Sequence, residues 1–295
     1  MKNLLSHPSV ELKRLFILSN PRSGSSLLRL MLNRHAQVIV PPESGFALWL
    51  YSEFGSWQQE DCFKDRLKIF LKKLGESRKF KTWDLPLDRL KLQIEKEQPA
   101  NYGDLIACVY QAFSPTKKDA IIVDKNNYYV HHLDTLAQLW PDAGFIHLIR
   151  DGRDVACSYL ELKKLKSNSP YKPNLSNSLP NIASEWQENN LAIQSFVRNR
   201  MHVQVSFEDL VLKPRRTLED LVAFIGVPFD ADMFSFFKQE RKEFSEPKET
   251  LDWKMKTQEP LDKTRIGRYI EGLTAEQRAV FEKNASLALK QFNYE

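Results

Sequence analysis

Short apolar runs alternate along the chain with longer stretches in which apolar residues recur at helical spacing. Runs of strand length occupy residues 15–18, 38–40, 120–123, 145–149 and 202–207. Helical patterns cover residues 27–32, 63–74, 105–113, 131–140, 155–166, 182–198 and 218–224. A last helix is expected from Thr274, which together with Gln277 has the spacing of a capping box. Strands that alternate with helices predict an α/β fold, in which a central parallel sheet is flanked by helices on both faces.

Two segments do not follow this alternation. Residues 167–180 contain four Ser, three Asn and three Pro, which predicts a loop long enough to act as a lid. Residues 239–262 are charged and only weakly periodic. We expect this second segment to run irregularly over the surface.

A polar turn separates the first strand from the first helix. A strand, a tight turn and a helix in this order leave free backbone N–H groups at a helix N-terminus, where an anion is favoured. The glycine of the turn allows a close approach of the backbone, while the serines and the arginine add donors. The turn could be a phosphate cradle or an ordinary strand-to-helix connection, and it lacks the Walker A pattern of ATPases and GTPases. Its candidate ligands are Arg22, Ser23, Gly24, Ser25 and Ser26.

A second candidate anion site follows the strand predicted at residues 145–149. Arg150 ends that strand, and Ser158 lies eight residues later, near the start of the next helix. Lys125 likewise follows the strand predicted at residues 120–123. Ligands of parallel sheets bind beyond the carboxyl ends of the strands. We therefore expect these residues and the Arg22 turn at one edge, around a ligand that is phosphorylated at two separate positions.

The two motifs together resemble those of the sulfotransferases that use 3′-phosphoadenosine 5′-phosphosulfate (PAPS). Residues 21–28 resemble the 5′-phosphosulfate loop of that family, and residues 145–158 resemble its 3′-phosphate motif. Weaker matches are Lys125, residues 207–210 and residues 263–269, in the family's order. The resemblance implies the sulfotransferase fold, which is like that of P-loop nucleotide kinases, in a single domain over residues 1–295. It also implies PAPS as sulfuryl donor and 3′,5′-adenosine bisphosphate (PAP) as product.

The resemblance also implies roles for individual residues. Glu43 lies 21 residues after Arg22, the spacing of the catalytic glutamate in protein-tyrosine sulfotransferases, so Glu43 is implied as the general base. A histidine, the base of cytosolic small-molecule sulfotransferases, is the alternative. Arg22 and Lys125 would stabilise the leaving phosphate. The implied cofactor ligands are the Arg22–Ser26 turn, Arg150 and Ser158 for the 3′-phosphate, and Lys263 and Arg265 in the C-terminal loop. Phe207 stands where relatives have a tyrosine that contacts the nucleotide.

Two other functions remain open from the sequence. A nucleotide or small-molecule kinase could use the same cradle, but the chain has no Lys-Ser/Thr at the end of the loop and no clear Mg²⁺ carboxylate site. A non-catalytic protein that binds PAPS or PAP would keep the nucleotide site and show no turnover. Transfer from PAPS without magnesium, and none from ATP, would separate the enzyme from the kinase.

Composition narrows the partners and the compartment. The 295 residues carry a net charge of +5, which suits an anionic small ligand better than a nucleic acid. Cys62, Cys108 and Cys157 are far apart, and no metal or disulfide pattern is present. No apolar run has the length of a membrane span, and the first 14 residues lack the apolar core of a signal peptide, so we expect a cytoplasmic protein.

The acceptor is less defined than the donor. We expect a small molecule with a hydroxyl group, although a sugar, a lipid or polyketide intermediate and a peptide tyrosine all fit the sequence. Aromatic side chains in the first third of the chain suit either an apolar pocket or the core, and the core is favoured for most of them. These are Phe46, Trp49, Tyr51, Trp57 and Trp83. The sequence predicts no oligomeric state.

Overall fold

The computed structural model describes residues 14–58, 63–117, 119–238 and 244–295. The expectations for Cys62, for the first 13 residues and for residues 239–243 lie outside the described part. Within it, no helix is long and apolar enough to cross a membrane.

A five-stranded sheet forms the centre of the described structure, and its order is β2-β3-β1-β4-β5. All of its strand pairs are parallel, as the alternating pattern predicts. The strands are β1 (Arg14–Leu18), β2 (Val38–Ile39), β3 (Ile121–Lys125), β4 (Gly144–Ile149) and β5 (His202–Ser206). Because β1 lies between β3 and β4, the loops that follow these three strands emerge next to one another.

Helices surround the sheet, as expected. In the first half of the chain they are α1 (Ser25–Arg34), α2 (Phe46–Trp49), α3 (Tyr51–Phe54), α4 (Phe63–Glu76), α5 (Leu87–Glu97), α6 (Tyr102–Phe113) and α7 (Leu133–Leu139). In the second half they are α8 (Gly152–Lys164), α9 (Leu179–Val197), α10 (Phe207–Leu212), α11 (Pro214–Ile225), α12 (Tyr269–Gly272) and α13 (Ala275–Gln291). Short 3-10 helices join them: η1 (Phe80–Trp83), η2 (Asn127–His131), η3 (Ala231–Ser235), η5 (Lys248–Trp253), η6 (Met255–Gln258) and η7 (Lys263–Arg265).

The boundaries differ from the predicted ones where a side chain caps a helix. The strand predicted to reach residue 207 ends at Ser206, because the Ser206 side chain accepts a hydrogen bond from the Asp209 N–H and starts α10. The helix predicted from residue 131 begins at Leu133, after the 3-10 turn η2. The capping box of Thr274 and Gln277 is present at the start of α13.

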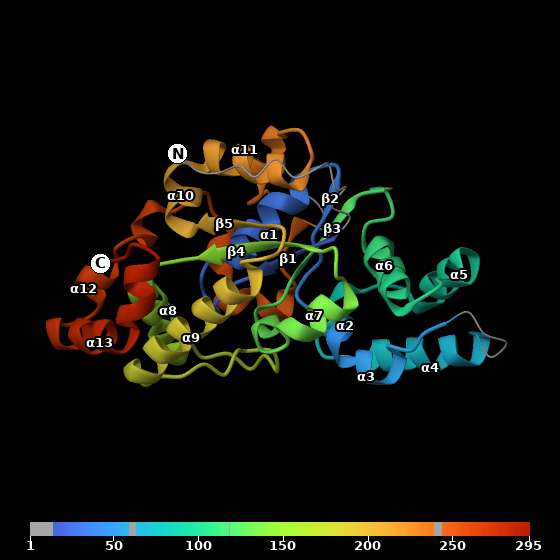
Figure 1. Ribbon diagram of the computed structural model, residues 1–295, viewed down its shortest axis with the longest axis horizontal. Coiled ribbons are helices and arrows are strands. Elements are labelled where there is room, and N and C mark those ends of the chain that lie inside the picture. Colours follow the sequence, from blue (N-terminus) through green and yellow to red (C-terminus); the bar gives the residue numbers. More distant parts are fainter. Residues whose placement is uncertain (1–13, 59–62, 118, 239–243) are drawn as a thin grey trace.

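Both faces of the sheet are covered, and the side chains of β1 alternate between them. Leu15 and Ile17 belong to a buried cluster with residues of α1 and α11. Phe16 and Leu18 belong to another cluster with residues of α2 to α6. In Figure 1 the sheet lies in the middle, with α3 to α6 at one end of the molecule and α12 and α13 at the other. Strand β1 is therefore packed against buried side chains on both faces of the sheet.

A third buried cluster fixes the region after β4. Trp186 of α9 and Phe281 of α13 pack together there, and their rings meet the start of α8. A Cβ added at Gly152 would lie 2.6 Å from each of these two side chains, so the contact has room only for glycine. Trp186 also donates a hydrogen bond of 3.1 Å to the carbonyl of Arg150. The backbone of Arg150 is therefore held by the core.

The expectation that residues 239–262 run over the surface is wrong for five residues of their described part. Phe244, Glu246, Thr250, Trp253 and Thr257 are buried. The segment folds into η5 and η6, and the carbonyl of Trp253 accepts a hydrogen bond from Arg22 in the loop after β1. Glu246 and Lys254 form an ion pair inside the molecule, whereas Lys256 and Glu259 pair on the surface.

Candidate active site

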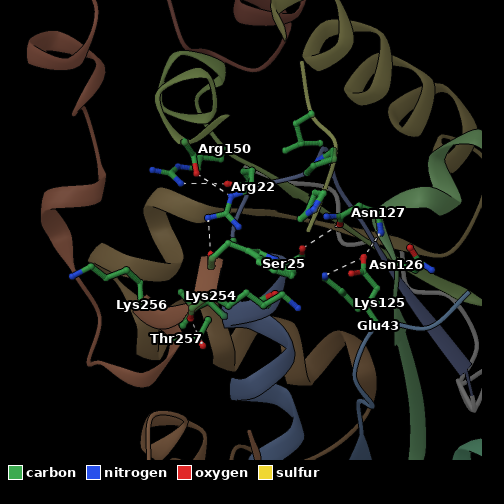
Figure 2. A pocket seen from close by; sticks show the side chains of 18 of the residues that line it. Arg22, Ser25, Glu43, Lys125, Asn126, Asn127, Arg150, Lys254, Lys256 and Thr257 are labelled. Carbon is green, nitrogen blue, oxygen red and sulfur yellow. Dashed lines mark hydrogen bonds and ion pairs between the residues drawn. The ribbon is translucent and has the colours of Figure 1, made fainter. Parts of the chain in front are cut away.

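A cavity of about 840 Å³ opens at the carboxyl ends of β1, β3 and β4. Arg22, Lys125 and Arg150, which follow or end these strands, all line it. Figure 2 shows Arg22 and Arg150 together at one side of the cavity, with Lys125 and Glu43 together at the other side. The structure thus brings the separate motifs of the sequence into one site.

The turn after β1 has the geometry of an anion cradle. Gly24 is the N-cap of α1 and has a left-handed backbone with φ +95°, and no side chain caps the helix. Gly24, Ser25 and Ser26 line the cavity, so the positive end of the helix dipole faces it. A Cβ at Gly24 would lie 2.4 Å from the ring of Phe207. Glycine is therefore required there both by the backbone and by the packing of Phe207.

Arg22 and Ser158 are in direct contact. Arg22 Nε donates a 3.0 Å hydrogen bond to Ser158 Oγ, and Arg22 Nη2 donates one of 3.1 Å to the carbonyl of Trp253. Arg150 Nη1 donates to the carbonyl of Arg22 at 3.3 Å, and the Arg150 guanidinium stacks on Phe207 at 4.3 Å from the ring centre. The two candidate anion sites therefore share one wall of the cavity. Phe207 lacks the hydroxyl of a tyrosine, but its ring supports Arg150.

This wall has a positive potential and several unused donors. Burial lowers the pKa of Arg150 to about 10, while Asp154 opposes the shift. Burial and the charges of Arg265 and Arg268 lower the pKa of Arg22 to about 10. Among the described residues, four buried polar atoms of this region have no hydrogen-bond partner: Ser23 Oγ, Arg150 Nε, Arg268 Nε and Arg268 Nη2. Unsatisfied buried donors are costly, and Arg150, which has one of them, lines the cavity, so this wall fits an anionic ligand.

The C-terminal loop approaches the same wall through Asp154. The carboxylate of Asp154 accepts hydrogen bonds from the N–H groups of Gly267 (2.8 Å) and Tyr269 (3.0 Å). Arg265 lines the cavity, and its carbonyl accepts from Arg150. Lys263, the other residue implied by the resemblance, is exposed and lies outside the lining. The sequence missed Arg268, which pairs with Glu161 at 2.6 Å.

Glu43 and Lys125 lie together at the other side of the cavity. Glu43 is 15% exposed and Lys125 is 3% exposed, and their charged atoms are 3.5 Å apart. Burial disfavours the Glu43 carboxylate, but the charges of Lys125, Lys79 and Lys254 outweigh burial and hold the pKa of Glu43 well below its usual range. Burial lowers the pKa of Lys125 to about 8, against the pull of Glu43. This side of the cavity therefore holds an ionised carboxylate beside a lysine whose pKa is lowered.

Three residues near Glu43 were missed by sequence reasoning. Lys79 Nζ donates a 2.7 Å hydrogen bond to Glu43 Oε2, and Lys79 has a left-handed backbone with φ +65°. The Asn127 N–H lies 3.4 Å from Glu43 Oε1, and the Asn127 side chain accepts from Ser19 and Ser25. Lys254 lines the cavity from the segment after η5. Lys79 and Lys254 had no sequence signal, because each is one lysine in a lysine-rich stretch.

The histidines and aromatic residues near the cavity have different positions. His131 lines the cavity and is exposed, whereas His147 is buried in β4 beside Asn190 at 3.2 Å. Of the aromatic residues that the sequence left between pocket and core, Trp49 lines the cavity. Phe46, Trp57 and Trp83 are core residues, as favoured. Tyr171, Lys172 and Pro173, in the loop before α9 that the sequence predicted, also line the cavity.

Comparisons with known proteins agree with this architecture. A model of the sulfotransferase family matches residues 14–231. Protein-tyrosine sulfotransferase 1 of Danio rerio is 23% identical over 221 residues, which are 73% of this chain and 54% of that protein. The chain therefore spans about half the length of that curated relative.

Two solved structures have a similar fold. The sulfotransferase domain of the Synechococcus PCC 7002 olefin synthase has a TM-score of 0.59 at 22% identity, over 94% of this chain and 97% of that one. A sulfotransferase domain from the curacin biosynthetic pathway has a TM-score of 0.63 at 19% identity, over 95% and 97%. At these identities the likeness establishes the shared fold.

Proposed function

The chain belongs to the sulfotransferase family, and on that premise we propose that it transfers a sulfuryl group from PAPS to an acceptor hydroxyl. Family and fold make it a transferase of sulfuryl groups in general. The donor, the base and the acceptor are our proposal. We further propose that the described residues act as one sulfotransferase domain.

The wall of the cavity that contains Arg22 and Arg150, called the arginine wall below, would hold the nucleotide. A doubly phosphorylated donor carries about four negative charges near neutral pH. Arg150 and Ser158 would bind the 3′-phosphate, and the N-terminus of α1 with Ser25 and Ser26 would bind the 5′-phosphosulfate. Arg22 touches Ser158 and belongs to the cradle, so its guanidinium would lie between the two groups. Arg265 would cover the site from the C-terminal loop.

Glu43 would accept the proton of the acceptor hydroxyl. A general base is most effective when its pKa is near the working pH, and Lys125, Lys79 and Lys254 hold the pKa of Glu43 far below that. An anionic donor offers Lys125 a second partner, because Lys125 lies at the end of β3 beside the cradle. When Lys125 turns from Glu43 to the leaving oxygen, the pKa of Glu43 rises and the carboxylate becomes a stronger base.

Apart from the proton that Glu43 would accept, the transfer would need electrostatic help from the protein. PAPS would supply the sulfuryl group: its sulfur would gain a bond to the acceptor oxygen as its bond to the 5′-phosphate oxygen broke. By analogy with phosphoryl transfer, the charge that develops would fall on the leaving oxygen. Lys125 and Arg22 would stabilise that charge, and a preorganised donor of this kind contributes about 3 kcal/mol.

One observation carries this proposal. Arg22 with Arg150 and Ser158, and Glu43 with Lys125, come from four segments distant in sequence and line one cavity. An ordinary strand-to-helix turn would not need a second arginine with an unpartnered Nε beside it. A kinase would need clustered carboxylates for Mg²⁺ at the cradle. Glu43 is neutralised by Lys79 and Lys125, and the described residues contain no cluster of three or more carboxylates, histidines or cysteines that could hold a metal ion.

The direct test measures binding and transfer separately. PAP should raise the thermal stability of the protein, by about 2.7 kcal/mol at 100 times its dissociation constant. Transfer is then followed as release of PAP from PAPS with EDTA present, using 4-nitrophenol, a tyrosine peptide, 1-octanol and glucose as acceptors. We expect turnover with PAPS and none with ATP. Stabilisation by PAP without turnover on any acceptor would favour a binding protein, and turnover with ATP and magnesium would favour a kinase.

A further inference from the structure

Lys254 is a cavity residue to which the proposed function gives no role. It follows η5, its side chain is 8% exposed, and it lines the cavity. Its neighbour Trp253 accepts a hydrogen bond from Arg22 through its carbonyl. One dipeptide thus connects the arginine wall with the interior of the cavity. Figure 2 shows Lys254 entering the cavity from the same side as Lys256 and Thr257.

A buried ion triad holds the Lys254 ammonium in place. Lys254 Nζ lies 2.7 Å from Glu246 Oε2, and Arg29 Nε lies 3.1 Å from Glu246 Oε1. Arg29 and Glu246 are each 1% exposed. The remaining Arg29 donors reach the carbonyls of Val40 (3.0 Å) and Ser245 (2.7 Å), so Arg29 is anchored behind the cradle.

Arg29, Glu246 and Lys254 together carry a net positive charge. Of the three, Lys254 lines the cavity and brings this charge to it. Burial opposes the Glu246 carboxylate, but Arg29 and Lys254 outweigh burial and lower the pKa of Glu246 to about 2, so two cations share one anion. A buried ion pair is seldom a gain in stability over apolar packing, so stability alone does not account for this one. The charge of Lys254 also acts on Glu43 and on Lys125, and it lowers the pKa of both. Lys254 therefore lies close to these two residues.

The cations nearest to the cradle and to Glu43 already have roles in the proposed mechanism. Arg22 contacts Ser158, and Lys79 and Lys125 pair with Glu43. Arg22 and Lys125 are assigned there to the leaving oxygen, whereas the sulfuryl group that moves between the cradle and Glu43 bears oxygens of its own. Lys254 enters this space from the dipeptide beside Arg22, and Glu246 Oε2 lies 2.7 Å from its ammonium nitrogen.

We propose that Lys254 is a further catalytic residue, which binds the oxygens of the sulfuryl group and is positioned by the Arg29–Glu246 pair. The inference rests on the proposed function, since it assumes PAPS in the cavity. A purely structural role, in which Lys254 only holds the segment from residue 244 to 258 in place, is the competing explanation.

The two explanations differ in what Lys254 does for PAPS and for PAP, because PAP lacks the sulfuryl group. The dissociation constants of both nucleotides are measured by calorimetry without acceptor for wild type, Lys254→Met, Lys254→Arg and Lys248→Met. Lys248 is the control, since it is an exposed lysine of the same segment outside the cavity. A charge-assisted hydrogen bond corresponds to roughly tenfold or more in affinity. We expect Lys254→Met to weaken PAPS binding about tenfold and to change PAP binding less than twofold.

The charge-conserving and control variants complete the test. Lys254→Arg should restore most of the preference for PAPS, and Lys248→Met should bind both nucleotides like wild type. Equal weakening of PAPS and PAP by Lys254→Met would overturn the proposal, as would no weakening of either. If Lys254→Met does not fold, Lys254→Gln is measured instead, because its amide can still bond to Glu246. Failure of the wild type to bind either nucleotide would be a different result, which refutes the proposed function itself.

Discussion

The two ends of the cavity are built from different kinds of charge. The end formed by Arg22 and Arg150 uses guanidinium groups, which stay protonated at any relevant pH, and it keeps buried donors without partners. The end formed by Glu43 and Lys125 uses groups whose pKa values are shifted by their neighbours, and its charges are paired. A permanent positive charge suits the binding of phosphates. Adjustable, mutually neutralised charges suit a step in which a proton moves.

The largest difference between the two ends of the cavity is expected from a substitution of Glu43. Glu43→Gln removes the proton acceptor but keeps the shape of the side chain, so transfer should fall by about 10²–10⁴-fold. PAP binding should be retained, because the arginine wall is untouched. Initial rates of PAP release and calorimetric binding of PAP measure the two effects. A rate within a few-fold of wild type would transfer the role of base to another residue, with His131 as the exposed candidate in the cavity.

A substitution of Arg150, in contrast, should remove the binding of PAP. Arg150→Ala removes the guanidinium that stacks on Phe207 and bonds to the Arg22 carbonyl, so the stabilisation of about 2.7 kcal/mol by PAP at 100 times the wild-type dissociation constant should disappear. Thermal unfolding with and without PAP measures this effect. Arg216→Ala, at an exposed arginine of α11, is the matched control. Lys263→Ala should also leave the PAP effect intact, because Lys263 lies outside the cavity lining. Full stabilisation of Arg150→Ala by PAP would contradict the division into two ends.

The sequence predicted the fold and the end of the cavity formed by Arg22 and Arg150 better than the end formed by Glu43 and Lys125, for a physical reason. The turn after β1 and the turn after β4 are local motifs, so a few adjacent residues define their geometry. The contact between Arg22 and Ser158 joins residues 136 positions apart, yet it follows from two neighbouring parallel strands. Lys79 and Lys254 come from irregular segments whose path depends on buried partners such as Glu246. No periodicity or spacing could place them.

The smallest expected effect is a shift in the pH dependence of the activity. Glu43 is active as a carboxylate, and its pKa is held low by Lys125, Lys79 and Lys254, so activity is lost only when the pH falls through that low value. Lys79→Met removes one of these three cations, and the pKa of Glu43 should rise. The acid limb of kcat/KM against pH should therefore move to higher pH. The basic limb follows Lys125, which must be protonated to stabilise the leaving oxygen and has a pKa of about 8; because Lys79 contributes least to lowering that pKa, this limb should rise less than the acid limb. Lys81→Met, at an exposed lysine of η1, should move neither limb. An unmoved acid limb in Lys79→Met would mean that the low pKa of Glu43 does not control the reaction.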